Sequence, residues 1–374
     1  MRATIVITVA AACLTSLPSA ARTKNQLTAS WTTAVGFDSN PNRVEPSSNQ
    51  DPTPTAFQTG ILMLTDDFAP CRSERFQVQY LAATKLHFSR DAKSADIFLH
   101  RAALAWIHSM RQASLSWRTS FMQSRESSLT GTVSNSQPPV INAMDFLTAS
   151  TSLNADMALS KTWSIGLSAA GNLFRYAPDD HLSFEGWTLA ANLNRIFDFG
   201  SLTRHRQIDL VTTFSASIRR YHDQVDENDG SVRRSDVLYD ASERVSYVGA
   251  FLAEVEYHLS ANLSNAASWS VIRHRATIRV ATALPWHLFA VARITYQYLQ
   301  YPNSLLLYAP SSSSTFLKLD EESRSSALVS LQRHLGPNRT LQVRYVLYAD
   351  LTTIASHQRY LRHIAMAELS IHFE

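Results

Sequence analysis

The sequence has few charged residues for its length and no long hydrophobic segment. Asp, Glu, Lys and Arg together make up 17% of its 374 residues, whereas about 25% is usual for globular proteins. Hydrophobic residues make up 45%, yet no apolar run reaches the roughly 18 residues that suggest a membrane-spanning helix. The apolar residues are therefore dispersed along the chain. This pattern argues against a helical membrane protein and favours strands in which apolar and polar residues alternate.

Cysteine is nearly absent, and the net charge is small. The two cysteines are Cys13 and Cys71, and Cys13 falls in a segment that we expect to be removed. A single remaining cysteine cannot form an internal disulfide or a zinc site built on cysteines. A formal net charge of +3 is too low to indicate nucleic-acid binding. The sequence also suggests no metal or other cofactor.

The first 21 residues have the composition of a secretory signal peptide. Arg2 provides a positive start, residues 3–14 are apolar, and Ser19, Ala20 and Ala21 are small residues before a predicted cleavage site. We therefore expect residues 1–21 to be removed and residues 22–374 to form one domain. Lipid attachment at Cys13 is the alternative, and it would leave only a short leader before the anchor.

The end of the chain shows the alternation most clearly. Residues 360–374 carry apolar side chains on one parity and polar ones on the other, with His363 as the polar exception on the apolar side. One apolar face and one polar face predict an amphipathic strand. Such a strand needs neighbours at both edges, and a closed antiparallel sheet would supply them by pairing the last strand with the first.

Similar strands are predicted along the whole chain. The stretch from 237 to 267 allows two interpretations: a short strand near Leu238 followed by one at 245–258, or strands at 245–257 and 259–269. Both give about sixteen antiparallel strands, with 14–18 as the acceptable range. The other predicted strands are 27–37, 56–65, 76–88, 96–108, 112–124, 143–159, one starting at 163, 182–197, 207–221, 272–284, 287–301, 325–335, 340–351 and 360–373.

Strand length and aromatic placement favour a transmembrane barrel over a secreted β-sandwich. Several predicted strands exceed the usual five or six residues, and about 9–11 tilted residues are enough to cross a bilayer. The predicted connections alternate between short and long, as they do in outer-membrane barrels. Aromatic residues gather near predicted strand ends, as in interfacial girdles: Trp31, Phe37, Trp106, Trp117, Phe121, Trp163, Tyr176, Trp286, Tyr298, Tyr301, Tyr345 and Tyr348.

Three short stretches resemble porin-like outer-membrane barrels of the β-barrel porin 2 type. These are residues 35–43 at the end of the first strand, residues 273–275 leading to Leu284-Pro285-Trp286, and the closing strand from Tyr360. A terminal Glu374 after Phe373 departs from the aromatic ending of many such barrels. The resemblance implies an all-β barrel in the outer membrane of a Gram-negative bacterium. Some members of such families are implicated in polysaccharide export, whereas others are described only as porins.

The polar parity of each strand should face the interior of the barrel. An excess of inward arginine would favour anions through fixed positive charge, while the alternative is that these residues pair across strands and fill a wet interior. Arg101 and His363 lie on the apolar parity and fit neither picture. The residues predicted to line the interior are Lys85, Arg118, Arg219, Arg273, Arg275, Arg279, Arg293, Arg344, Arg362 and Glu368, with Asp209 as a further acid.

Two patterns share some residues with known catalytic sites and lack others. His258-Leu259-Ser260 has the spacing of barrel hydrolases, where a base activates a serine, but Ala261 replaces the asparagine that those enzymes carry. Asp66-Asp67 and Asp180-His181 resemble protease acid pairs, yet they fall at opposite ends of the predicted barrel. We therefore expect no enzymatic activity.

The sequence predicts a channel or conduit for polar solutes, with a preference for anionic ones. A dedicated exit port for polysaccharide is a variant of this function. Its partners would be outer-membrane lipid, the solute or polymer, and periplasmic export components in the case of export. The alternative from another class is a non-conducting surface or scaffold barrel that binds a partner through its loops or periplasmic turns.

Overall fold

The computed structural model describes the strands and part of the connections. It covers residues 24–41, 54–89, 92, 96–126, 146–176, 183–199, 206–225, 232–265, 270–300, 325–349 and 361–373. The expected signal peptide lies outside these residues. No helix that they form is long and apolar enough to cross a membrane.

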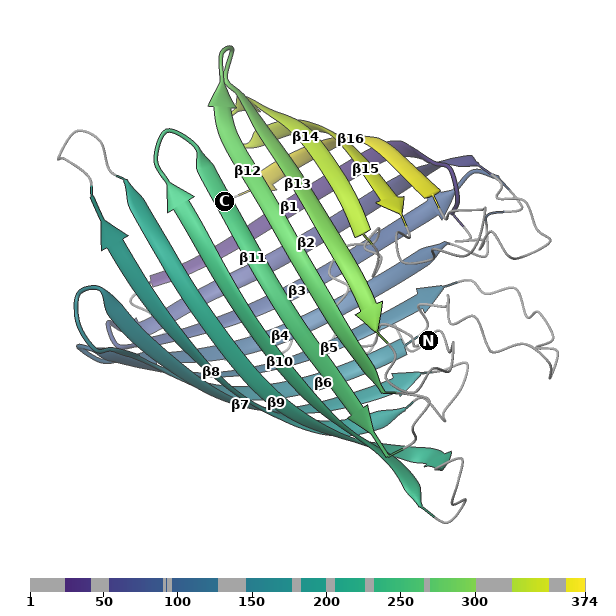
Figure 1. Ribbon diagram of the computed structural model, residues 1–374. Coiled ribbons are helices and arrows are strands. Elements are labelled where there is room, and N and C mark those ends of the chain that lie inside the picture. Colours follow the sequence, from purple (N-terminus) through teal and green to yellow (C-terminus); the bar gives the residue numbers. More distant parts are fainter. Residues whose placement is uncertain are drawn as a thin grey trace.

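The described residues form sixteen strands in one closed antiparallel barrel (Figure 1). This confirms the predicted all-β class and the expected strand number. The strands are β1 Lys24–Asp38, β2 Thr55–Cys71, β3 Glu74–His87, β4 Ile97–Ser109, β5 Ala113–Glu126, β6 Phe146–Ala158, β7 Trp163–Tyr176, β8 Phe184–Asp198, β9 Gln207–Val225, β10 Arg233–Val248, β11 Leu252–Ser264, β12 Val271–Leu284, β13 Leu288–Gln300, β14 Ser325–Gly336, β15 Arg339–Ala349 and β16 Leu361–Phe373.

The last strand closes the barrel against the first, as the sequence predicted. β1 pairs with β16 from Ala29 opposite Phe373 to Asp38 opposite Ile364. β1 pairs with β2 on its other edge, and every other strand pairs with its sequence neighbours. Closure leaves no strand edge exposed to water or lipid, which removes the usual route to edge-to-edge aggregation.

The two rims of the barrel differ in the length of their connections. At the short-turn rim, strands are joined by turns such as residues 72–73, 249–251 and 337–338. At the loop rim, the connections include residues 39–54, 127–145 and 301–324. β1 begins and β16 ends at the short-turn rim, so the first and last strand residues of the barrel both lie there.

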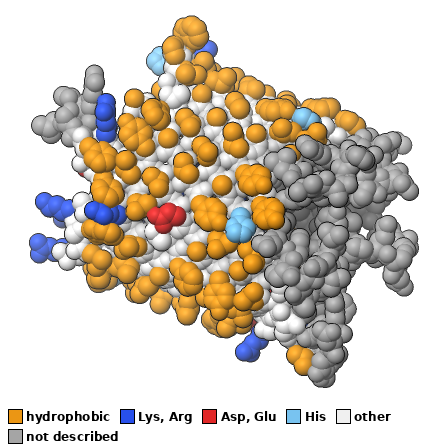
Figure 2. Space-filling view, viewed as in Figure 1, with side chains coloured by type: hydrophobic (Ala, Val, Ile, Leu, Met, Phe, Trp, Pro, Cys, Tyr) orange, Lys and Arg blue, Asp and Glu red, His pale blue; other side chains and the backbone are white. Residues whose placement is uncertain are grey.

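Alternation gives the sheet an apolar outer face and a mixed inner face. On β1, Leu27, Trp31, Val35 and Phe37 project outward and are exposed, whereas Asp38 projects inward and is fully buried. The outer surface of the barrel is accordingly covered with hydrophobic side chains (Figure 2). Because successive side chains of a strand point to opposite faces, the predicted parity of β1 and β16 is what the structure shows.

Both interpretations of residues 237–267 were wrong. The turn falls at residues 249–251, inside the strand that each interpretation drew through this stretch, and it joins β10 to β11. Val248 pairs with Leu252 across the turn, so odd-numbered residues face outward on both strands. A three-residue connection of this kind leaves the alternation unbroken and hides the turn from a periodicity argument.

Several other expectations need correction. Tyr176 and Tyr348, expected in a girdle, are buried on the inner face. Arg101 also lies on the inner parity, opposite Met122 and Leu81, because the apolar parity of its strand was assigned to the wrong face. The connection after the predicted strand 207–221 is shorter than expected, since β9 extends to Val225 and β10 begins at Arg233, before the stretch from 237. Tyr301 lies outside the described residues.

Candidate functional site: the inner wall of the barrel

The ten residues predicted to line the interior all project from the inner parity of β3, β5, β9, β12, β13, β15 and β16. They do not form a uniform ring. Some of them are neutralised by acidic residues, and others make no ion pair within the described residues. This difference decides how much fixed charge a solute would meet.

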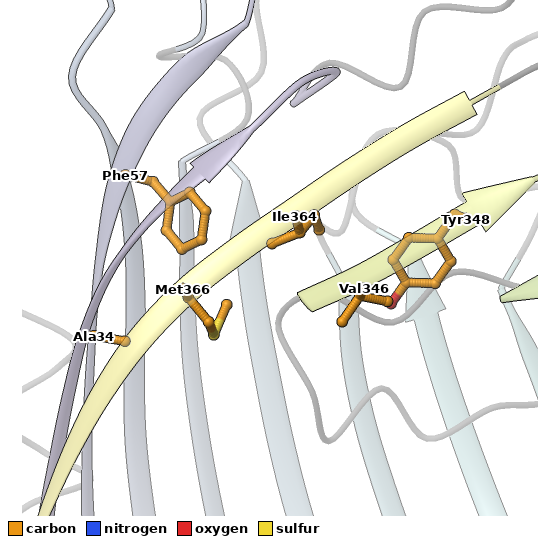
Figure 3. Close-up of a cluster of buried hydrophobic side chains, with 6 residues drawn as sticks. All are labelled: Ala34, Phe57, Val346, Tyr348, Ile364 and Met366. Atoms are coloured by element: carbon orange, nitrogen blue, oxygen red, sulfur yellow. The ribbon is translucent and has the colours of Figure 1, made fainter. Parts of the chain in front are cut away.

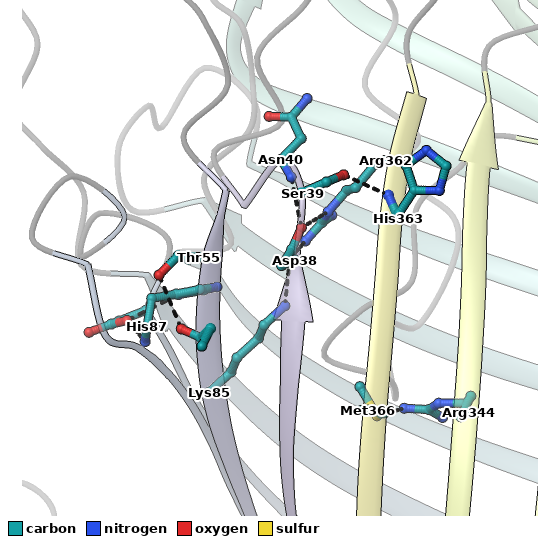
Figure 4. A network of polar contacts seen from close by, with 12 residues as sticks. Asp38, Ser39, Asn40, Thr55, Lys85, His87, Arg344, Arg362, His363 and Met366 are labelled. Carbon is teal, nitrogen blue, oxygen red and sulfur yellow. Dashed lines mark hydrogen bonds and ion pairs between the residues drawn. The ribbon is translucent and has the colours of Figure 1, made fainter.

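Lys85 and Arg362 belong to a buried ion-pair network at the loop rim. Arg362 Nε and Nη2 donate to the two carboxylate oxygens of Asp38 at 2.9 and 2.5 Å, and Lys85 Nζ donates to Asp38 Oδ2 at 3.0 Å (Figure 4). Lys85 Nζ also lies 4.3 Å from the centre of the Phe57 ring. These two cations therefore hold β1, β3 and β16 together, and their role is primarily structural.

A second ion-pair network lies on β9–β11, and the sequence reasoning missed it. Arg234 donates to both oxygens of Asp236 at 2.9 and 2.5 Å. Tyr221 and Asn262 each donate to Asp236 Oδ2 at 3.2 Å. The parity shared by Arg234, Asp236 and Leu238 could have identified this strand, but the surrounding charges suggested a loop.

Four arginines form a belt closer to the short-turn rim. Each is the sixth residue of its strand counted from that rim, and each lies on the inner parity. We call this set the arginine belt: Arg118 on β5, Arg279 on β12, Arg293 on β13 and Arg344 on β15.

The belt places positive charge on opposite walls of the barrel. Arg118 on β5 lies eight strands from Arg293 on β13 in the ring of sixteen. Arg279 and Arg293 stand directly opposite each other across two neighbouring strands. Among the described residues, no ion pair involves Arg118, Arg279 or Arg293. Arg344 Nη2 donates to Met366 Sδ at 2.8 Å.

The remaining predicted residues have mixed surroundings. Arg275 lies 3.6 Å from Glu256 in an ion pair, while Arg273 pairs in register with Ser260. Arg219 packs 4.8 Å from the centre of the Phe184 ring. Glu368 is the sixth residue of β16 from the short-turn rim and lies opposite Gln342. Asp209 accepts a hydrogen bond from Gln207 at 2.5 Å.

A polar hollow of about 260 Å³ adjoins the belt at Arg118. Gly166 adjoins two of the lining residues, since an added methyl group there would come within 2.5 Å of Asp156 and Asn192. Hydroxyl, amide, carboxylate and guanidinium groups all reach the hollow, so it can hydrogen-bond a polar solute. The polar side chains lining it are Ser116, Arg118, Asn154, Asp156, Ser168 and Asn192.

The inner wall also carries apolar clusters that the sequence reasoning did not predict. One joins the seam strands at the loop rim (Figure 3): Ala34, Phe57, Val346, Tyr348, Ile364 and Met366. A row of rings continues from β6 to β9, with centroids 5.1–6.5 Å apart, and it consists of Phe146, Phe174, Tyr176, Phe184 and Tyr221. The loop-rim half of the interior is therefore partly hydrophobic, while the other half carries the arginine belt and the polar hollow.

The candidate hydrolase residues His258 and Ser260 are not arranged as a base and the nucleophile that it activates. His258 Nε2 is 3.2 Å from Asp240 Oδ1, while Ser260 stands opposite Asp240 in the strand register. The imidazole therefore contacts the acid, and within this described region the histidine makes no hydrogen bond to the serine. A nucleophilic serine needs its base at hydrogen-bond distance.

The predicted acid pair Asp66-Asp67 does not form a protease site either, because its two carboxylates lie on opposite faces of the sheet. Asp66 pairs with Leu27 on the outer parity, and Asp67 accepts hydrogen bonds from Arg75 and Gln77 at 3.0 and 3.2 Å. The Asp180-His181 pair lies outside the described residues.

Comparisons with known proteins support the fold. No family model and no curated protein matches the chain. Salmonella typhi OmpF, in a complex with daunomycin, matches with a TM-score of 0.52 and 10% identity over 96% of this chain and 99% of that one. Pseudomonas aeruginosa OpdQ matches with a TM-score of 0.48 and 9% identity, covering 95% and 99%. At these identities the likeness extends to the closed barrel and no further.

Proposed function

We propose that this protein is an outer-membrane channel of a Gram-negative bacterium that passes polar solutes and favours anions. The arginine belt is the observation that carries the proposal. Three of its members make no ion pair among the described residues, and Arg118 and Arg293 stand on opposite walls. Fixed positive charge around a polar passage lowers the energy of an anion relative to a cation.

The outer face of the barrel supports its placement in a membrane. Strands of 11–19 residues exceed the length needed to cross a bilayer when tilted. Large apolar side chains such as Leu27, Leu189 and Ile294 are 60–67% exposed there, which would be costly in water and is favourable in lipid. Short turns and both strand ends at one rim match periplasmic turns, so the loop rim would face outward.

The same belt would also favour an anionic polysaccharide passing outward, because the polymer carries the same negative charge as a small anionic solute. Resemblance to the β-barrel porin 2 type suggests this variant, and periplasmic export components would then be partners. A non-conducting scaffold barrel is the competing function. The polar hollow beside Arg118 favours the channel, because a scaffold has no need of solute-binding groups on its inner wall.

Conductance in planar lipid bilayers tests the proposal. The purified barrel should produce stepwise ionic currents, and a salt gradient should give a reversal potential on the anion-selective side. Small anionic sugars should block the current more strongly than neutral sugars of equal size. Insertion without current, including after trimming of the loops, would exclude the channel and favour the scaffold.

A further inference from the structure

Three tyrosine–histidine pairs repeat the same construction on the outer face of the barrel. In each, a tyrosine hydroxyl lies at hydrogen-bond distance from the histidine Nδ1 on the following strand. The O–N distances are 2.9 Å for Tyr80 and His100, 2.7 Å for Tyr257 and His274, and 2.7 Å for Tyr345 and His363.

The local sequence explains the repeated geometry. The tyrosines stand directly opposite alanines, at Ala102, Ala276 and Ala365. Each histidine precedes its alanine by two residues, so it is the diagonal neighbour of the tyrosine on the same face. The small alanine leaves room for the phenol ring to lean across the strand boundary toward the imidazole.

All three pairs lie near the loop rim. The histidines are the third or fourth residues of β4, β12 and β16, which all begin at that rim. Figure 2 shows histidine side chains among hydrophobic ones close to that end of the outer surface. In the second pair, His274 also packs against Tyr298, with ring centroids 6.1 Å apart. His363, which the sequence pattern left unexplained, belongs to the third pair.

The pairing leaves one hydrogen-bond donor free for a ligand. When the tyrosine hydroxyl donates to Nδ1, the neutral imidazole carries its hydrogen on Nε2; a protonated imidazole carries hydrogen on both nitrogens. Nε2 therefore offers an N–H when the tyrosine donates and when the imidazole is protonated; only the neutral tautomer whose Nδ1–H donates to the tyrosine oxygen lacks it. Within the described residues, Nε2 of these three histidines has no protein acceptor.

The first pair has further polar groups beside it. Gln123 stands opposite His100 on β5, and Arg125 lies two residues further toward the loop rim on the same outer parity. With its amide oriented to accept, Gln123 Oε1 lies 3.0 Å from Arg125 Nε. A guanidinium and an imidazole N–H on one membrane-facing surface are complementary to a phosphate group.

We propose that the three pairs are binding sites for the phosphate groups of outer-leaflet lipid. This inference rests on the proposed membrane location, in which the loop rim faces outward. Each site would take one lipid phosphate on histidine Nε2, with the tyrosine fixing the orientation of the ring. The Arg125 guanidinium would make the site at His100 the tightest of the three.

Lipid retention measured by native mass spectrometry tests the proposal. The probes are lipid A and the same lipid with its phosphates removed, each added to the purified full-length barrel in detergent. The wild type should retain lipid A about tenfold better than the dephosphorylated form, the size expected when a charge-assisted hydrogen bond is lost. The combined variant His100→Phe, His274→Phe and His363→Phe should lose this preference.

Two further variants keep the test sharp. His108→Phe removes an outward histidine at the short-turn rim, where its Nδ1 lies 2.6 Å from Glu74, and it should retain lipid A like the wild type. The second variant combines three substitutions, Tyr80→Phe, Tyr257→Phe and Tyr345→Phe. It keeps the aromatic rings and removes only the hydroxyls, so it should weaken retention of lipid A. It therefore tests the proposal even if the histidine variant does not fold.

The outcomes separate this proposal from the proposed function. Equal retention of the two lipids by the wild type would overturn the lipid sites, and so would unchanged retention by the folded histidine and tyrosine variants. Bilayer currents from the same preparations would remain in those cases. A barrel that neither inserts nor conducts would instead remove the membrane location on which the inference rests.

Discussion

Arg362 and Asp38 form a two-pronged ion pair across the seam of the barrel, although 324 residues separate them in the chain. Both side chains are buried, with exposed fractions of 2% and 0%. Their strands, β16 and β1, are the last and first of the sheet. The pair therefore fixes the register in which the two ends of the chain meet.

Replacing Asp38 should destabilise the closed barrel strongly. In Asp38→Asn the buried cations Arg362 and Lys85 lose their shared carboxylate, and breaking a buried pair typically costs about 3–5 kcal/mol. Urea unfolding in lipid vesicles would measure the loss. Asp209→Asn is the matched control, because Asp209 is an inner-face acid that is only half-buried. Equal stabilities of the two variants would contradict a closing role for Asp38.

A methyl group at Gly36 should also disturb the seam. An added Cβ there would lie 2.6 Å from both the carbonyl oxygen of Ala365 and the Phe57 ring. Overpacking of this kind costs about 1–3 kcal/mol. Gly60→Ala is the control, since its nearest neighbour would be at 3.4 Å. Thermal unfolding followed by gel mobility should rank Gly36→Ala clearly below Gly60→Ala; the reverse order would show that the seam is loosely packed.

Removing the carboxylate of Glu243 should stabilise the barrel in lipid. Glu243 faces outward on β10, midway between Tyr239 and Tyr247, and accepts a hydrogen bond from Thr212 at 2.6 Å. A charged side chain at this depth is unfavourable, so Glu243→Leu should gain about 1–2 kcal/mol. Glu243→Gln should gain less. Urea titration in phosphatidylcholine vesicles would show this, and a loss of stability would indicate that something other than lipid covers this surface.

The outer face of the barrel could be predicted from sequence for a physical reason. In the proposed membrane location, lipid accepts only apolar side chains across most of this face, which accounts for the regular alternation in stretches such as residues 27–37 and 361–373. His363 interrupts the apolar parity, but its Nδ1 hydrogen-bonds the Tyr345 hydroxyl near the loop rim. Strand number followed from this regularity even where one turn was misplaced.

The inner wall was harder to predict, because it obeys no single polarity. Ile364 and Met366 face inward beside Arg362, so hydrophobicity alone does not tell the faces apart there. Lys85 and Arg362 lie on the inner parity as predicted, but the first predicted strand, 27–37, ended one residue before their common partner Asp38. Such partners lie far apart in sequence, and only the closure of the barrel brings them together.

The fixed charge of the arginine belt is the basis of the proposed anion selectivity. The decisive measurement is the reversal potential of single channels in a potassium chloride gradient, for the wild type and for Arg279→Gln combined with Arg293→Gln. The wild type should be anion-selective, and the double variant should shift toward zero or cation selectivity. Arg333→Gln, which removes an exposed outward arginine near the short-turn rim, should leave the potential unchanged. An unaltered reversal potential in the double variant would contradict selection by the belt.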